Sequence, residues 1–248
     1  GKVTVNFDAY YGFSGSPNYR HGMTRDEWVT YQQEAYKYKN GDYPTDMSAL
    51  LGKQDFIDAY NDGKWIDWID EVSGNTATTQ KYSLSVSSGT EKTKLFASTS
   101  YNREEGLLNN ENLNRYSLRL NLDQQIFSWA KVGFTSNLVY RDLNSGVKNT
   151  FTKSLSAIPL GDASTEKGEI NHEYITGQYS PMSDFIENQY VDNTRSTYLN
   201  MSGYVELTPV KDLTFTSRVN GTLNHSRRGQ YWGEKCNANR PSYAGSPH

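Results

Sequence analysis

The chain has 248 residues, a net charge of −3 and an isoelectric point near 5.9, so it lacks the basic surplus typical of nucleic-acid-binding domains. Only 35% of its residues are hydrophobic, but 13% are aromatic, and the apolar positions recur with a regular period that excludes a disordered chain. No run of eighteen apolar residues and no signal-peptide pattern occurs, so no membrane-spanning helix is predicted. Because a strand pattern follows directly after the initial glycine, we expect a processed N-terminus or an excerpt of a longer polypeptide.

Seven segments alternate apolar and polar residues with a period of two, the pattern of a β-strand with one exposed face. Segment 115–126 is the clearest, because Leu118 and Leu120 fall on one face and Arg119 and Asn121 on the other. The predicted strands cover residues 2–12, 80–87, 93–103, 115–126, 130–142, 197–207 and 213–224. The sequence therefore predicts an all-β fold, an antiparallel sheet with one apolar and one polar face.

The connections between these strands alternate in length. Short turns lie near Gly89, Ser128 and Pro209. The long segments are 13–79, 143–196 and 225–248. In an up-and-down sheet every second connection lies at the same rim, so the short turns gather at one rim and the long loops at the other. Transmembrane β-barrels of bacterial outer membranes show this asymmetry, with long loops outside the cell and strands of about 9–11 residues crossing the bilayer.

Aromatic residues stand near the ends of the predicted strands. Phe127 and Trp129 lie at a short turn. The rim of the long loops has Tyr11, Tyr101, Tyr116 and Tyr140. This placement is typical of the aromatic girdles at membrane interfaces. Seven strands would leave two open edges in lipid, where unpaired backbone groups are costly, so the barrel interpretation requires further strands from the same polypeptide or a partner.

A soluble β-sandwich is the alternative fold, because its strands also alternate. It predicts that Leu118, Leu120 and Leu122 are buried against a second sheet. In functional terms, this alternative corresponds to a secreted module that binds carbohydrate with aromatic loop residues.

The first long segment has helical signals. Thr24 and Glu27 form a capping-box pattern before a run with apolar residues at helical spacing that ends at Gly41, and a second helix is expected over 53–60. Four aromatic residues of this segment are candidates for contact with a ligand or a partner protein: Trp28, Tyr43, Trp65 and Trp68. Their rings would either contact a sugar or peptide, or pack the helices of the loop and dock them to a partner protein. We favour the second role.

The polar face of the sheet supplies another group of candidates, which are Arg119, Asn121, Asp123 and Lys131. These side chains are expected to face the interior of a barrel, where they would line a transport pathway or contact a plug. We favour contact with the plug.

The sequence has no enzyme motif, so no catalytic residue is predicted. The four histidines have no metal-ligand spacing, and Asp67 and Asp70 are interpreted as a solvated helix face. The single cysteine, Cys236, is interpreted as an incidental loop thiol. We expect no metal site and no cofactor, with incidental calcium binding as the one exception.

Several segments together carry a family resemblance. They are 1–7, 65–71, 82–94, 96–98 with Tyr101, 105–106, 115–123, 129–133 and 208–215. In this order they resemble the early barrel of SusC/RagA-type TonB-dependent outer-membrane transporters, and the part from Tyr82 to Asp123 is the most specific.

The resemblance implies a 22-stranded barrel closed by an N-terminal plug, of which this chain supplies about seven strands. The plug, the remaining strands and the segment that contacts the TonB complex would lie outside these residues. The resemblance also implies the outer membrane of a Gram-negative bacterium, contact with its lipid, and a SusD-like surface lipoprotein as a lid. The expected function is TonB-dependent import of an oligosaccharide or a peptide, without enzymatic activity.

Overall fold

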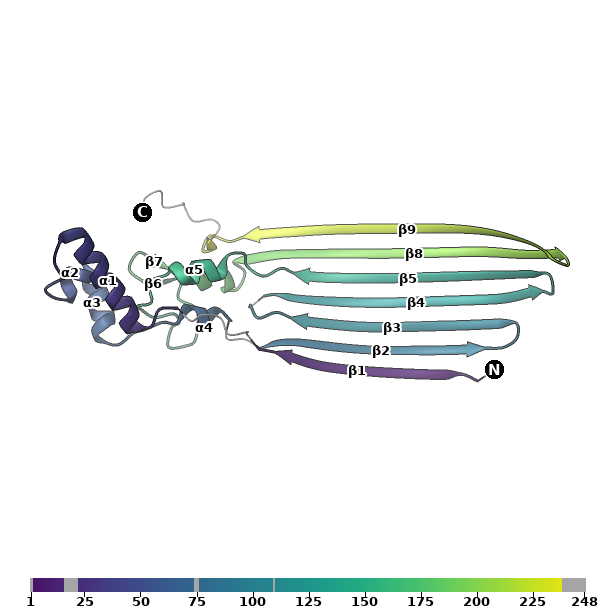
Figure 1. The fold of residues 1–248 in the computed structure, drawn as a ribbon, viewed down its shortest axis with the longest axis horizontal. Coiled ribbons are helices and arrows are strands. Elements are labelled where there is room, and N and C mark those ends of the chain that lie inside the picture. The colour runs from purple at the N-terminus through teal and green to yellow at the C-terminus, as the bar shows by residue number, and fades with distance from the viewer. Residues whose placement is uncertain (1, 16–21, 74–75, 109, 238–248) are drawn as a thin grey trace.

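The computed structural model describes residues 2–15, 22–73, 76–108 and 110–237. Its main feature is one sheet of seven strands, which pair antiparallel in the order in which they occur in the chain (Figure 1). The strands are β1 (Thr4–Ser14), β2 (Ala77–Gly89), β3 (Thr93–Glu105), β4 (Asn112–Phe127), β5 (Ala130–Asn144), β8 (Tyr190–Val210) and β9 (Leu213–Trp232). The predicted antiparallel, mostly β architecture is confirmed, and the sheet is open, with β1 and β9 at its edges.

The connections alternate as predicted. The short turns β2–β3, β4–β5 and β8–β9 lie at one end of the sheet, and the helices gather at the other end (Figure 1). All seven strands run further toward the helices than the sequence indicated. The largest differences are in β8, which begins at Tyr190 rather than 197, and in β9, which continues to Trp232 rather than 224. The predicted loop 225–248 is therefore wrong for its first eight residues, 225–232.

These extensions escaped prediction for a physical reason. In the register of β8 and β9, Asn193 lies opposite Gly229 and Arg195 opposite Arg227. These positions continue the apolar face of the sheet but carry polar side chains, so both faces are polar and the two-residue period disappears. The backbone ladder continues because it does not depend on the polarity of the side chains.

Register places the apolar residues in rows that cross the whole sheet. One row follows the sheet from edge to edge: Phe7, Leu84, Thr99, Leu118, Leu138, Leu199 and Leu223. The next row toward the helices contains four adjacent tyrosines, the tyrosine girdle: Tyr82, Tyr101, Tyr116 and Tyr140. The ring centroids of Tyr101 and Tyr116 are 4.9 Å apart, and those of Tyr116 and Tyr140 are 6.2 Å apart. Tyr11 lies one row further, opposite Gln80.

The long segments fold into short helices and a small hairpin. These are α1 (Arg25–Asn40), α2 (Met47–Leu51), α3 (Gln54–Asn61), α4 (Trp68–Ser73), α5 (Thr150–Ser156), β6 (Glu173–Ile175), β7 (Gln178–Tyr179) and the 3-10 helix η1 (Pro181–Phe185). The capping box is confirmed, because the Thr24 backbone N–H donates to Glu27 Oε2 at 2.9 Å and the Glu27 N–H donates to Thr24 Oγ1. Helices α2, α5 and η1 have five to seven residues, too few for a helical period to show in the sequence. Among the described residues, no helix is both long and apolar enough to cross a membrane.

The apolar core of the described residues lies mainly in these loops rather than against the sheet. A cluster from both long segments forms this loop core: Trp28, Phe56, Ala59, Ile66, Trp68, Val72, Val147, Leu160, Tyr174, Ile175, Met182 and Phe185. In the sheet, by contrast, Phe7 is 67% exposed and Leu118 is 52% exposed. No second sheet covers Leu118 and Leu122 within the described chain, so the β-sandwich alternative is wrong.

Candidate functional site

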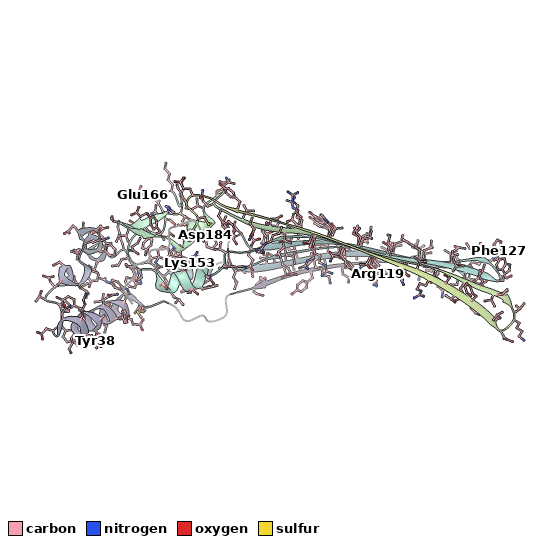
Figure 2. The ribbon with its side chains drawn as sticks, turned by 90° about the horizontal axis from the view of Figure 1, so that it is seen from above. Tyr38, Arg119, Phe127, Lys153, Glu166 and Asp184 are labelled. Carbon is pink, nitrogen blue, oxygen red and sulfur yellow. The ribbon has the colours of Figure 1, made fainter. Side chains whose placement is uncertain are left out.

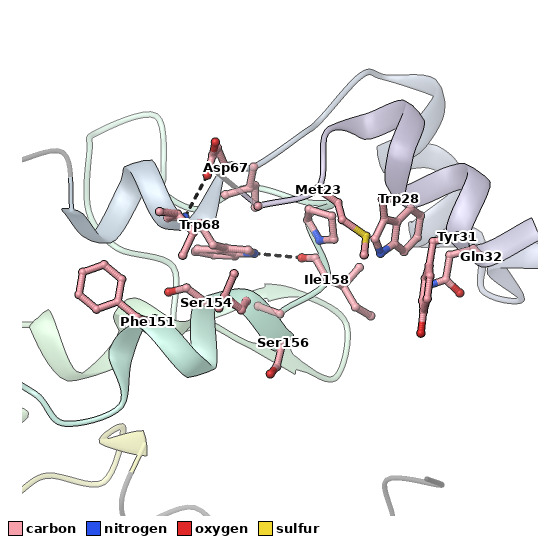
Figure 3. Close-up of a pocket in the computed structure, with 16 residues that line it drawn as sticks. Met23, Trp28, Tyr31, Gln32, Asp67, Trp68, Phe151, Ser154, Ser156 and Ile158 are labelled. Carbon is pink, nitrogen blue, oxygen red and sulfur yellow. Dashed lines mark hydrogen bonds between the residues drawn. The ribbon is translucent and has the colours of Figure 1, made fainter. Parts of the chain in front are cut away.

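A cavity of about 840 Å³ opens between the two long segments at the helical end of the molecule (Figure 3). Its walls come from α1, from the segment that leads into α4, and from α5 with the residues that follow it. The lining is Gly22, Met23, Trp28, Tyr31, Gln32, Ile66, Asp67, Trp68, Ile69, Phe151, Ser154, Leu155, Ser156, Ala157, Ile158 and Pro159. Most of these groups are apolar, and the polar ones stand at intervals between them, as in many ligand pockets.

Trp68 joins the two halves of this cavity. Its indole Nε1 donates a hydrogen bond of 3.0 Å to the carbonyl oxygen of Ile158, which links α4 to the segment after α5 (Figure 3). The ring is 3% exposed and meets Tyr174 edge to face, with centroids 4.7 Å apart. Asp67 orients the start of α4, because its carboxylate accepts from the backbone N–H of Ile69 at 3.0 Å. The indole is thus held both by packing and by a hydrogen bond.

Burial also changes the chemistry of the neighbouring phenol. Tyr174 is 5% exposed, and burial raises its pKa to about 12, because a phenolate would lose its hydration there. A hydrogen bond with the backbone of Ile158 opposes this rise in part. Tyr174 therefore remains a neutral packing residue beneath Trp68 at physiological pH.

The structure brings together only part of the predicted aromatic group. Trp28 and Trp68 line the cavity, and both are buried. The Trp65 ring meets the Trp28 ring edge to face, with centroids 6.1 Å apart. The backbone of Trp65 forms an isolated β-bridge with Leu160. Trp28, Trp65 and Trp68 therefore pack the helices of the loop, although the contacts that they make with a ligand or partner stay a prediction.

Tyr43 is separate from this group. It is 51% exposed, its hydroxyl donates to Glu34 at 2.6 Å, and the ammonium group of Lys37 lies 4.2 Å from its ring centroid. These contacts fix the ring on the outer surface near the end of α1. Tyr43 is not part of the cavity lining.

Sequence reasoning missed half of the cavity. Phe151 and Leu155 stand four residues apart on α5, so they share one face of the helix, and Leu155 is 64% exposed. On the opposite wall Met23 is 50% exposed and Tyr31 is 57% exposed. The i, i+4 spacing of Phe151 and Leu155 was the available signal, but α5 is too short for that spacing to stand out.

The predicted polar residues share one face of the sheet. Arg119, Asn121 and Asp123 alternate with the leucines along β4, and Lys131 lies opposite Gln125 on the same face. A band of uncharged residues surrounds Arg119, and its row contains Asn6, Ser85, Ser98, Asn137, Asn200 and Thr222. Whether these groups contact a plug or a ligand stays a prediction.

Asp123 belongs to a polar network that crosses three strands. The Tyr204 hydroxyl on β8 donates to Asp123 Oδ1 on β4 at 2.6 Å and passes over Gly133 on β5. A side chain at Gly133 would overlap the Tyr204 ring, so glycine is required for this approach. The ammonium group of Lys131 lies 5.5 Å from the same ring.

The described residues contain no group of three or more histidine, cysteine, aspartate and glutamate side chains arranged to hold a metal ion. His21 and His248 lie outside the described residues, as does the chain beyond residue 237. Asp67 and Asp70 are both exposed, as expected of solvated carboxylates, and Asp67 in addition caps α4. Incidental calcium binding stays a prediction.

Cys236 is buried rather than an incidental loop thiol. Its thiol donates to Asp184 Oδ1 at 2.9 Å, and the backbone N–H of Asn237 donates to the same oxygen at 2.6 Å. Asp184 is 2% exposed and pairs with Lys153 Nζ at 3.3 Å (Figure 2). These contacts fasten Cys236 and Asn237, which follow β9, to η1.

Comparison with known proteins agrees with this architecture. No protein-family model matches the chain. The TonB-dependent receptor P26 of Formosa agariphila is 22% identical over 236 residues, which is 93% of this chain and 22% of that protein. The RagAB peptide importer in the closed-closed state superposes with a TM-score of 0.71 at 22% identity, covering 92% of this chain and 29% of that one. In the open-open state the TM-score is 0.72 at 23% identity, covering 93% of this chain and 28% of that one.

The resemblance to SusC/RagA-type TonB-dependent transporters is confirmed. The similarity to RagAB establishes the fold, in which the open sheet corresponds to a segment of a β-barrel wall. The chain spans less than a third of each of these proteins. Both relatives carry the name of a receptor or an importer, and neither carries the name of an enzyme.

Proposed function

We propose that this chain forms part of the barrel wall of a TonB-dependent importer in the outer membrane of a Gram-negative bacterium. The importer carries a peptide or an oligosaccharide and has no enzymatic activity. The rest of the polypeptide supplies the remaining strands, the plug and the contact with the TonB complex, and a SusD-like lipoprotein closes the outer side. The short length of the chain relative to its relatives supports this division of parts.

The observation that carries the proposal is the height of the exposed apolar band. Tyr116 of the tyrosine girdle and Ile126 near the short-turn end lie ten residues apart on β4. At about 3.4 Å per residue and a tilt of about 45°, ten residues cover about 24 Å along the membrane normal. This height agrees with the apolar band of about 25 Å that outer-membrane barrels present to lipid. Leu118 and Leu122 lie within the band and are exposed.

The aromatic ends of the band support the same orientation. The tyrosine girdle marks the interface near the long loops, while Phe127 and Trp129 stack at 5.3 Å near the short turns. The helices and the cavity therefore lie on the outer side, where a ligand arrives and where a lid would close. The exposed apolar groups around the cavity, Met23, Tyr31 and Leu155, suit contact with either one. The name of the RagAB relative favours a peptide as the ligand.

The test uses the full-length gene in its own bacterium. Deletion of the gene is expected to abolish uptake of a fluorescent peptide mixture or a fluorescent oligosaccharide mixture, and the full-length gene should restore it. Removal of TonB should have the same effect as the deletion, because import needs that energy source. The full-length protein should fractionate with the outer membrane and co-purify with a surface lipoprotein.

Two results would contradict the proposal. One is recovery of the full-length protein in a soluble fraction. The other is uptake of both mixtures at the wild-type rate in the deletion strain. Failure of a surface lipoprotein to co-purify would contradict the proposed lid but not the proposed import function.

A further inference from the structure

On the polar face of the sheet, two arginines lie opposite each other on neighbouring strands. Arg115 on β4 lies directly opposite Arg141 on β5, and both side chains are exposed. Cβ atoms of directly opposed residues are about 4.5–5.5 Å apart, and like charges at this separation destabilise a sheet. Lys81 lies in the same row on β2, two strands from Arg115. The wall therefore maintains an unfavourable concentration of positive charge.

The described chain does not neutralise this pair. Within the described residues, the guanidinium groups of Arg115 and Arg141 make no ion pair and no side-chain hydrogen bond. The ion pairs of this part of the chain are made by other lysine and arginine side chains. Glu104 on β3 lies one row away and accepts a hydrogen bond of 2.6 Å from Asn102, and none of the ion pairs among the described residues joins it to Arg115 or Arg141. On the opposite face of the sheet, Arg195 also lies across from an arginine, Arg227. There, however, Asp142 forms an ion pair with Arg195 at 3.2 Å.

Arg119 extends the same charge further into the barrel. It lies four residues along β4 from Arg115, on the same face, at a distance of about 13 Å along the strand. Its neighbours across the sheet, Ser98 and Asn137, are uncharged, and its side chain points away from the strands at mid-sheet (Figure 2). We call Arg115, Arg119 and Arg141 the arginine patch. The patch begins beside the tyrosine girdle, and so at the end of the wall nearest the cavity.

We propose that the arginine patch binds the carboxylates of an anionic ligand on its way through the barrel. This inference rests on the proposed import function and specifies the chemical class of the cargo. The planar guanidinium group binds carboxylate through two parallel hydrogen bonds, which makes arginine the basic residue best suited to this role. Carboxylates occur both in acidic peptides and in uronate-containing oligosaccharides, and a repeat of carboxylates along either chain would engage successive arginines.

The test compares acidic and neutral cargo in cells that carry the full-length transporter. The probes are a fluorescent glutamate-rich peptide and its glutamine counterpart, and a fluorescent oligogalacturonate and its methyl ester. Unlabelled protein and polysaccharide hydrolysates, separated by anion exchange into acidic and neutral pools, provide a second readout through growth. The variant is Arg115→Gln/Arg141→Gln, and the control is Arg227→Gln, which removes an exposed arginine from the opposite face.

We expect uptake of one acidic probe, or growth on an acidic pool, to depend on this gene. The double variant should weaken uptake of the acidic probe by about tenfold to a hundredfold, since charged hydrogen bonds are lost, and leave a neutral probe unchanged. The control should transport like the wild type. The peptide and the oligogalacturonate arms identify which kind of carboxylate is carried.

The double variant is expected to remain in the membrane, because removing the two facing like charges relieves the repulsion between them. Surface labelling measures how much of the double variant reaches the outer membrane. In the wild type, competition between acidic and neutral probes measures the preference for acidic cargo independently of any variant. The proposal is overturned if gene-dependent uptake is confined to neutral cargo, or if the double variant retains the acidic preference. Equal loss of acidic and neutral uptake also overturns it, because the arginines would then hold another part of the protein. Unchanged uptake of every pool in the deletion strain contradicts the import function itself.

Discussion

Replacement of Trp68 with alanine is expected to open the loop core and leave the barrel wall intact. Truncation of a buried tryptophan costs about 3–5 kcal/mol, and the lost hydrogen bond leaves the Ile158 carbonyl without its indole donor. The edge contact with Tyr174 is lost at the same time. These losses overlap, so we expect the free energy of opening of the loop core to fall by about 4 kcal/mol.

Hydrogen–deuterium exchange of the full-length transporter in detergent is the appropriate assay. A loss of about 4 kcal/mol raises the population of the open state about a thousandfold, so amides of α5 and β6 should exchange much faster. Amides of β4 and β5 should keep their protection. Trp68→Phe retains a ring but loses the indole donor, and it should cost only about 1 kcal/mol.

Tyr38→Ala is the matched control for this experiment. Tyr38 is an aromatic residue of the same loop, but it is 95% exposed on α1, so its replacement should change stability by less than about 0.5 kcal/mol (Figure 2). If Trp68→Ala exchanged like the Tyr38 control, the two long segments would not share a core. If protection were lost in β4 and β5 as well, the loops and the sheet would unfold as one unit.

Two further outcomes follow from the packing. Gly133→Val should displace the Tyr204 ring and break the hydrogen bond from Tyr204 to Asp123. The midpoint of thermal unfolding of the barrel should fall by an amount equivalent to about 1–3 kcal/mol. An unchanged midpoint would contradict the close approach of Tyr204 to Gly133. Tyr174 has its pKa raised to about 12, so its burial contributes stability that is complete below pH 10 and is lost as the pH rises toward 12. The difference in absorbance at 295 nm between wild type and Tyr174→Phe should show this late ionisation, and a transition near pH 10 would contradict it.

The sheet was predictable because its chemistry repeats along the chain. Within the apolar band the two faces of the sheet differ in polarity at most positions, as at Leu118 and Arg119, so the period of two is visible in the sequence. Beyond the tyrosine girdle both faces carry polar side chains, and residues such as Arg195 and Arg227 give no alternating signal. For that reason the ends of β8 and β9 could not be derived from the sequence.

The cavity was only half predictable. Trp28 and Trp68 stood out because aromatic residues are concentrated in the first long segment. Phe151 and Leu155 come from a helix of seven residues more than 80 positions later, and only the folded loop core brings them opposite Trp68. Arg119 was a candidate from the sequence, but Arg115 and Arg141 were missed for a similar reason, since their pairing depends on strand register.

The central claim is that Leu118 faces lipid and Ser117 faces the interior of a barrel. Single spin labels at these adjacent positions in the full-length transporter, reconstituted in bilayers, test it most directly. We predict that the label at Leu118 is relaxed by oxygen, which concentrates in lipid, and that the label at Ser117 is relaxed more by a water-soluble nickel chelate. Equal protection of both labels from both reagents, or a lipid signal from Ser117 rather than Leu118, would contradict the account.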